Sequence, residues 1–197
     1  MKNIHGNFGL VIYFHVPKLK VGGIMNYKTH LNGGILSGLY ISSQMAGLPV
    51  ISTVTFIGGA ILGSILPDID HKNSYIGKKT KVVSSAINKF AGHRKLFHGP
   101  LIYLLLYSMS FGITNNKILM LGIKGIFLGI LSHLVLDSFT IGGVPWFYPF
   151  SKKKFSLGKF KTNGKLEDIL CGILVCINIV ILLDILHITS IFTFTQK

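Results

Sequence analysis

This sequence contains few charged residues, few acidic residues and few cysteines. Charged residues make up 13% of its 197 positions, whereas hydrophobic residues make up 49% and the mean hydropathy is +0.57. Soluble domains carry about 25% charged residues, so this composition excludes a disordered or collagen-like chain and favours a protein whose solvent is the lipid bilayer. The two cysteines, Cys171 and Cys176, fall on different faces of one helical run. They should be free thiols, which excludes a disulfide-stapled fold.

The charges that are present have mostly one sign. The sequence has 20 Lys and Arg residues against 6 Asp and Glu residues, which gives a formal net charge of +14. Such an excess is typical of nucleic-acid-binding proteins and of membrane proteins with basic cytoplasmic loops. Here the basic residues are divided between loops and form no platform with aromatic residues. We therefore expect the lipid bilayer as partner, and no nucleic acid.

Five apolar runs predict the fold. They are separated by alternately short and long connections, and each can cross or enter a bilayer as a helix. The runs are residues 31–43, 48–66, 99–113, 117–136 and 169–194. The sequence therefore predicts an all-α fold, a polytopic membrane bundle of about five transmembrane or membrane-embedded helices. Glycines such as Gly58 and Gly59, or Gly125 and Gly129, would let these helices approach closely.

Residues 1–24 differ from the rest of the chain. Their apolar stretch, GLVIYF, is too short for a signal-peptide core, and it is followed by Pro17 and two lysines. Met25 begins a segment that reads as a natural protein start. We expect residues 1–24 to be an upstream extension from a misassigned start codon or a disordered tail, and residues 25–197 to be a single membrane-embedded domain.

The connections predict the orientation of the bundle. The two long ones, residues 67–98 and 138–167, are rich in lysine and arginine, whereas the tight turns at residues 42–47 and 114–116 carry no charge. Because lysine and arginine near membrane spans stay on the cytoplasmic side, both long basic loops are expected to be cytoplasmic in the inner membrane.

Histidine and aspartate concentrate in four short motifs. The motifs are KTH at residues 28–30, SILPDIDHKNS at 64–74, HRKLFHGP at 93–100 and SHLVLD at 132–137. Each lies at one end of an apolar run, and successive runs reverse direction. All four motifs should therefore meet at the cytoplasmic end of the bundle. Ionisable groups at membrane depth are costly and usually mark a functional site.

The residue types and spacing in these motifs favour a metal centre. His133 and Asp137 are at positions i and i+4 of a helix and can reach a single ion, and Asp68 and Asp70 can turn toward a common point after Pro67. Imidazole and carboxylate groups suit Zn²⁺, with Mn²⁺ or Fe²⁺ as alternatives. The candidates exceed one tetrahedral site, so either two ions, or one ion with supporting residues, fits the sequence.

Each candidate residue has an expected role. The predicted metal ligands are His30, Asp68, Asp70, His93, His98, His133 and Asp137. Within this set Asp70 is also the candidate general base or bridging ligand. His71 is the candidate acid or ligand-orienting residue.

These motifs resemble the YdjM-like family of inner-membrane-associated metal-dependent hydrolases. The resemblance covers residues 27–150 and rests on THLNGG, GSILPDIDHKNS, HRKLFHGP, HLVLDSFTIGG and YPF in that order. It implies a membrane-embedded bundle with a His and Asp metal centre, similar in ligand style to zinc-dependent phospholipases C. The family's second histidine motif is closer to HRG-x-THS, so Lys95, Phe97 and Gly99 depart from it while both histidines are kept.

Such a centre predicts a membrane-bound hydrolase. A zinc-type ion makes water acidic enough to attack at neutral pH, so the expected reaction is hydrolysis of a phosphate ester or other ester in a lipid or small anionic substrate. A metal ion or proton transporter is the alternative, although it would place polar groups at mid-bilayer or on both faces. A non-catalytic membrane protein with a structural metal is the third interpretation.

One loop segment combines aromatic residues with neighbouring lysines. The segment GGVPWFYPF at residues 142–150 contains two prolines and cannot form a regular helix. Its aromatic side chains, among them Trp146, favour an anchor at the membrane interface, with a wall for a lipid-like substrate as the alternative. The adjacent lysines 152–154, and Arg94, could hold an anionic headgroup or simply set the topology.

Overall fold

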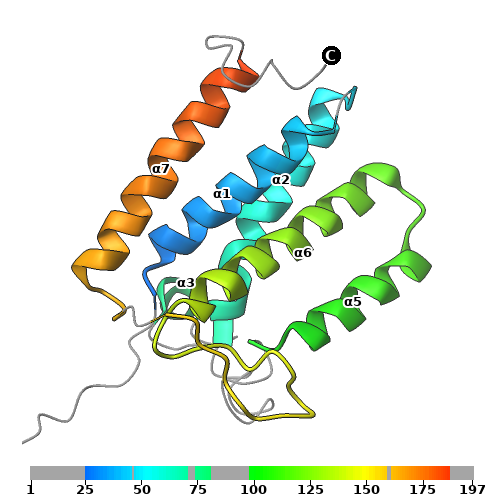
Figure 1. Cartoon of the computed structure of the whole chain (residues 1–197). Helices are drawn as coiled ribbons and strands as arrows, with labels where there is room; N and C mark the ends of the chain where they lie inside the picture. The colour runs from blue at the N-terminus through cyan, green and yellow to red at the C-terminus, as the bar shows by residue number, and fades with distance from the viewer. Residues whose placement is uncertain (1–24, 46, 71–73, 81–97, 159–160, 187–197) are drawn as a thin grey trace, which may run out of the picture.

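The computed structural model describes residues 25–45, 47–70, 74–80, 98–158 and 161–186, apart from the side chain of Asp70. In these residues the regular structure is helical, with one isolated β-bridge between Val144 and Phe155. The six α-helices and the 3₁₀-helix η1, drawn in Figure 1, are α1 (Tyr27–Ser43), α2 (Val50–Ile65), η1 (Leu66–Asp70), α3 (Tyr75–Lys79), α5 (Pro100–Ile113), α6 (Lys117–Ser138) and α7 (Lys165–Ile185). The predicted all-α fold is confirmed.

The apolar runs locate the helices well, and the differences lie at the helix ends. Helix α1 begins four residues before its predicted run, because the side chain of Asn26 accepts a hydrogen bond from the backbone N–H of Lys28 and so caps the helix. His30 therefore lies in the first turn of α1 instead of before it. The short helix α3, in the connection after α2, was not predicted. Of the last apolar run, residues 187–194 lie outside the described residues.

Three helical segments are long and apolar enough to cross a membrane. They are Val50–Ile69, Lys117–Ser138 and Lys165–Ile185, by length and composition. Helix α5 is also apolar but shorter, with 14 residues. The membrane character of the bundle agrees with the sequence, and full spanning by α1 and α5 stays a prediction.

The closest helix contact is between α2 and α6, and glycine makes it possible. A Cβ atom at Gly125 would collide with the backbone of Phe56, and a Cβ atom at Gly129 would collide with the backbone of Ala60. Gly59 and Gly63 play the same part from α2, each against the backbone of α6. Glycines four residues apart thus let the two backbones touch. The predicted close approach is confirmed for these positions, whereas Gly58 faces open space.

The helices alternate in direction and bring several ends together. The starts of α1 and α5 lie at the same end of the bundle as η1 and the end of α6 (Figure 1). Helix α5 packs on α6 through Tyr103, Ile130 and Leu134, and Val144 of the loop after α6 completes this core cluster. On the other side, α7 packs against α1 through Leu170 and Leu174 in a cluster with Met25, Leu36 and Leu136.

Candidate metal centre

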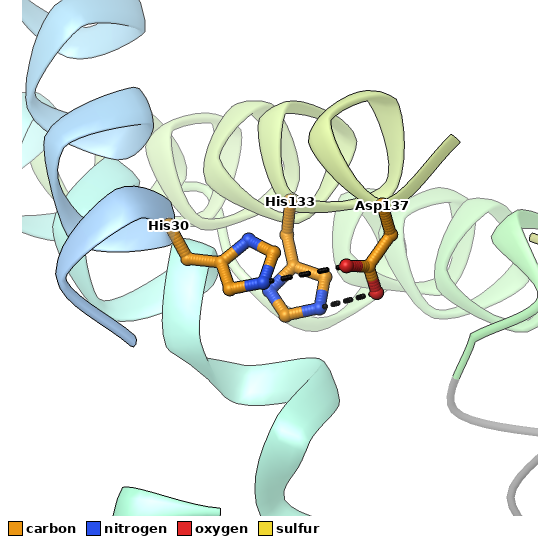
Figure 2. Close-up of side chains that lie close together, drawn as sticks. All are labelled: His30, His133 and Asp137. Atoms are coloured by element: carbon orange, nitrogen blue, oxygen red, sulfur yellow. Dashed lines mark ion pairs between the residues drawn. The ribbon is translucent and has the colours of Figure 1, made fainter. Parts of the chain in front are cut away.

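Five of the predicted residues converge at this end of the bundle. His30 comes from the first turn of α1, Asp68 from η1, and His98 from the residues just before α5. His133 and Asp137 lie one turn apart near the end of α6, and Figure 2 shows both pointing toward His30. The convergence follows from the reversal of direction between successive helices, as the motif positions predict.

The carboxylate of Asp137 is the common neighbour of three imidazole rings. Its Oδ1 atom is 3.4 Å from Nε2 of His30 and its Oδ2 atom is 3.4 Å from Nε2 of His133, the two contacts dashed in Figure 2. The same Oδ2 atom is 3.6 Å from Nε2 of His98. Good N–H···O hydrogen bonds measure about 2.7–3.2 Å, so these atoms face one another at longer range. This spacing suits donors arranged around a cation.

The centre is buried, and its nitrogen atoms are poorly satisfied. The rings of His30 and His133 are fully buried and stack with centroids 3.7 Å apart. In the part of the chain that the structure describes, neither ring nitrogen of His30 has a hydrogen-bond partner, and neither does Nε2 of His133. Buried polar atoms almost always have partners. A metal ion between these nitrogens and the Asp137 carboxylate would supply them, so the residues present fit a cation.

A backbone carbonyl holds His133 in the orientation that a ligand needs. The Nδ1 atom of His133 is 2.7 Å from the carbonyl oxygen of Ser64. A carbonyl can only accept a hydrogen bond, so Nδ1 must carry the proton, and a neutral ring then keeps its lone pair on Nε2. This supporting contact is typical of metal-binding histidines. Sequence reasoning missed Ser64, because a backbone carbonyl has no sequence signal.

A second group of candidate ligands overlaps the first. Asp68, His98 and His133 offer ligand atoms that all lie within 4.8 Å of one another, as do His30, His133 and Asp137. His133 belongs to both groups, so together they form one continuous centre of five residues.

The remaining predicted residues lie outside what the structure describes. His71 and His93 are not among the described residues, and neither is Arg94; of Asp70 only the backbone is described, as the last residue of η1. Their roles as ligands, base, acid or headgroup contact stay predictions.

Glu167 is a further residue that holds the centre in place. Its buried carboxylate, in the first turn of α7, accepts hydrogen bonds from the backbone N–H groups of Asn26 and Asn163 and from the Thr29 hydroxyl at 3.4 Å. It thus caps the start of α1 from a different helix, where negative charge also complements the helix dipole. No role is predicted for Glu167 from the sequence alone. An acidic residue in the first turn of a helix usually serves its own helix.

The start of α1 is also held by α3. The ring of Tyr27 stacks on the ring of Tyr75 with centroids 4.2 Å apart, and the Nζ atom of Lys79 lies 4.6 Å from the centre of the Tyr75 ring. A hydrogen bond with Tyr75 raises the pKa of Lys79. Contacts from α3 and α7 therefore fix the first turn of α1, from which His30 enters the centre.

The chain matches a known protein family over most of its length. The family model described as YdjM inner membrane protein matches residues 25–193. This chain belongs to the YdjM inner membrane protein family. The resemblance carried by the histidine and aspartate motifs is confirmed, and so is the predicted location in the inner membrane.

Curated relatives share substantial parts of the chain. The uncharacterized protein YvsG of Bacillus subtilis is 31% identical over 125 residues, which cover 64% of this chain and 74% of YvsG. The inner membrane protein YdjM of Escherichia coli is 35% identical over 95 residues, which cover 47% of this chain and 48% of that protein, and YdjM of Shigella flexneri gives the same values. The match thus spans about half the length of the YdjM relatives. No solved structure matches.

Proposed function

We propose that this protein is a membrane-bound, metal-dependent hydrolase that cleaves a phosphate ester or other ester of a lipid or small anionic substrate. The observation that carries the proposal is the buried cluster of His30, His133 and Asp137, in which ring nitrogens face a carboxylate and lack hydrogen-bond partners among the described residues. Histidine and carboxylate ligands suit Zn²⁺ best, with Mn²⁺ or Fe²⁺ as alternatives. An ion of this type would make a water molecule acidic enough to attack at neutral pH and would polarise a phosphoryl or acyl oxygen.

The described residues favour one ion. Both candidate ligand groups include His133, and its Nδ1 atom is already engaged by the Ser64 carbonyl. The ring therefore offers a single nitrogen, Nε2, and one lone pair coordinates one ion. His30, His133 and Asp137 would be its main ligands, with Asp68 and His98 completing the set. A second ion would need side chains outside the described residues, such as His71 or His93.

Burial indicates the side from which a substrate would approach. His30 and His133 are fully enclosed, whereas the side chains of Asp137 and His98 each keep 17% of their surface exposed. A substrate would therefore meet the centre over Asp137 and His98. In this arrangement the Ser64 carbonyl keeps His133 oriented and the packed helix ends limit the access of water. We retain Asp70 as the proposed general base and His71 as the proposed acid.

The position of the centre favours hydrolysis over transport. The helix ends that carry the five convergent residues meet at one end of the bundle (Figure 1), whereas a transporter needs polar groups near mid-bilayer or on both faces. Solvent access over Asp137 and His98 also favours a reactive centre over a purely structural metal. We further propose that this end faces the cytoplasm, because the long loops there are basic.

Metal analysis combined with a substrate screen tests the proposal. Detergent-purified protein should contain about one bound divalent ion per chain by elemental analysis, and it should hydrolyse a phosphoester or lipid ester in a chelator-sensitive way. His133→Ala should lose both metal and turnover, whereas Asp168→Asn, an exposed acid on α7, should keep both.

Other outcomes would contradict the proposal. Bound metal without turnover across phosphoester and lipid substrates would indicate a structural metal. Metal-dependent ion flux in proteoliposomes without hydrolysis would indicate a transporter. Full activity of His133→Ala would show that this cluster is not the active site.

A further inference from the structure

The loop that follows α6 has a defined conformation. Its Trp146 side chain donates a hydrogen bond from Nε1 to the hydroxyl of Ser138 at 2.9 Å, and Val144 and Phe155 form two backbone hydrogen bonds of 2.9 and 2.8 Å. Val144 is fully buried in the core cluster, and the N–H of Leu157 donates to the carbonyl of Ser138 at 2.7 Å. These contacts attach residues 139–158 to the end of α6, directly after Asp137.

The loop divides its aromatic residues between two faces. Trp146, expected at the membrane interface, instead packs partly buried against the core cluster. Phe147 and Phe150 point outward and expose 70% and 89% of their surface, and Phe155 and Leu157 are exposed as well. The exposed lysines 152–154 lie between them in sequence. An ordered loop therefore presents large apolar side chains and positive charge together.

This combination matches the membrane interface better than water or a protein core. Exposed phenylalanines are unfavourable in water, and a run of three lysines is unfavourable in an apolar protein interface. At the lipid headgroup level, apolar side chains such as phenylalanine are buried at the boundary of headgroups and acyl chains while lysines meet anionic phosphates. In Figure 1 the loop, drawn in yellow, lies at the end of the bundle where α1 begins and α6 ends. The candidate membrane span Lys117–Ser138 ends directly before this loop, and the candidate span Lys165–Ile185 begins soon after it.

We propose that residues 147–157 form a docking surface for anionic lipid headgroups, with Phe147 and Phe150 inserted at the interface and Lys152, Lys153 and Lys154 bound to lipid phosphates. The proposal rests on exposure, charge and position, and does not require the protein to be a hydrolase. The role of this docking surface in bringing a lipid substrate to the metal centre does rest on the proposed function. Because the loop starts two residues after Asp137, it would hold the open side of the centre at the level of lipid headgroups.

Depth measurement by spin labelling tests the insertion of Phe150. A nitroxide would be attached to Phe150→Cys, and in parallel to Lys161→Cys as an exposed control in the same connection, both in a Cys171→Ala and Cys176→Ala background in lipid nanodiscs. The label at position 150 should collide more with oxygen than with a water-soluble nickel chelate, and the label at position 161 should show the reverse. Nickel access at position 150 equal to that at position 161 would overturn the proposal. Protection from both reagents would also overturn it and would indicate a second copy or a protein partner.

A charge variant tests the lysines separately. An environment-sensitive fluorophore at position 150 should shift its emission to shorter wavelength when phosphatidylglycerol replaces part of the phosphatidylcholine in the nanodisc. The variant Lys152→Gln, Lys153→Gln and Lys154→Gln should lose this response to phosphatidylglycerol. The same response in the variant would contradict the role of the lysines. Neither measurement depends on turnover, so failure of the hydrolase proposal would leave these outcomes readable.

Discussion

Helices α2 and α6 meet in two regions of very different chemistry. In the first region, Gly59 and Gly63 of α2 and Gly125 and Gly129 of α6 bring the two backbones into contact. At their shared end, one turn beyond Gly129, His133 of α6 reaches the carbonyl oxygen of Ser64 on α2. The first region has no ligand chemistry, but its close packing decides the distance in the second. The glycine contact therefore keeps the end of α6 close enough to α2 for His133 to reach the Ser64 carbonyl.

The largest expected effect comes from breaking the glycine contact. Gly129→Leu would drive a side chain into the backbone of Ala60, and overpacking of this kind destabilises by about 1–3 kcal/mol or more. The variant should unfold at lower temperature and bind metal poorly, since α2 and α6 can no longer place Ser64 beside His133. Thermal unfolding and metal titration in detergent would measure both effects.

Gly58 provides the matched control for that experiment. It lies on the same helix as Gly59 but a Cβ atom there meets open space. Gly58→Ala should leave metal binding unchanged and be neutral or stabilising by up to about 1 kcal/mol, through the higher helix propensity of alanine. A loss in Gly58→Ala as large as that in Gly129→Leu would show that the α2–α6 contact is not the cause.

The next effect separates the ligands from the packing. Asp137→Asn keeps the size of the side chain but removes the charge that faces three histidines. Metal affinity should fall by about 100-fold or more, since changes even to residues that only support ligands cost roughly 10–100-fold. The helix packing should persist, as measured by circular dichroism. Unchanged metal affinity would show that Asp137 is not a ligand.

A smaller effect is expected from removing the Glu167 carboxylate, which caps the start of α1. Glu167→Ala leaves the N–H groups of Asn26 and Asn163 without their buried acceptor, a loss of about 1–3 kcal/mol. Metal affinity should fall as well, because His30 lies one helical turn after Asn26, whose N–H group donates to Glu167. Glu167→Gln, which keeps an acceptor oxygen, should restore part of the metal affinity, and Asp168→Ala should change neither quantity. Metal affinity equal to wild type in Glu167→Ala would limit Glu167 to a structural role.

The smallest effect should come from Thr29→Val. The substitution removes one hydroxyl, which donates to Glu167 over a long 3.4 Å contact, and keeps the shape of the side chain. A loss of about 1 kcal/mol or less in unfolding free energy is expected, with metal affinity nearly unchanged. A larger loss of metal affinity than in Glu167→Ala would show that Thr29, and not Glu167, is the main residue that positions His30.

Much of the site was predictable because its residues lie on regular elements. His133 and Asp137 follow helical spacing, so their shared face could be derived without coordinates. The reversal of direction between helices brought His30, Asp68 and His98 to the same end, as predicted. The apolar run predicts a start of α1 four residues too late, because Asn26 caps a polar first turn that hydrophobicity does not indicate. The predicted roles of His71 and His93 stay predictions, because both residues lie outside the described residues.

Other features could not be predicted, because they depend on contacts between elements. Trp146 has the same local sequence signal as Phe147, yet one packs on the core and the other faces outward. The contacts of Trp146 and Leu157 with Ser138, together with the pairing of Val144 and Phe155, decide which side of the loop faces α6. Likewise, the partners of Glu167 come from residues more than one hundred positions away in sequence as well as from its own turn.

The sequence by itself determined the membrane class, the approximate helices, the family and the set of histidines and aspartates that meet at one end. These follow from composition, periodicity and local motifs, which act over a few residues. Only the tertiary structure decided that the Ser64 carbonyl orients His133, that Glu167 caps the start of α1 and that Phe150 faces outward. The physical reason is that each of these depends on distances between separate helices and loops, which close packing sets and local sequence does not encode.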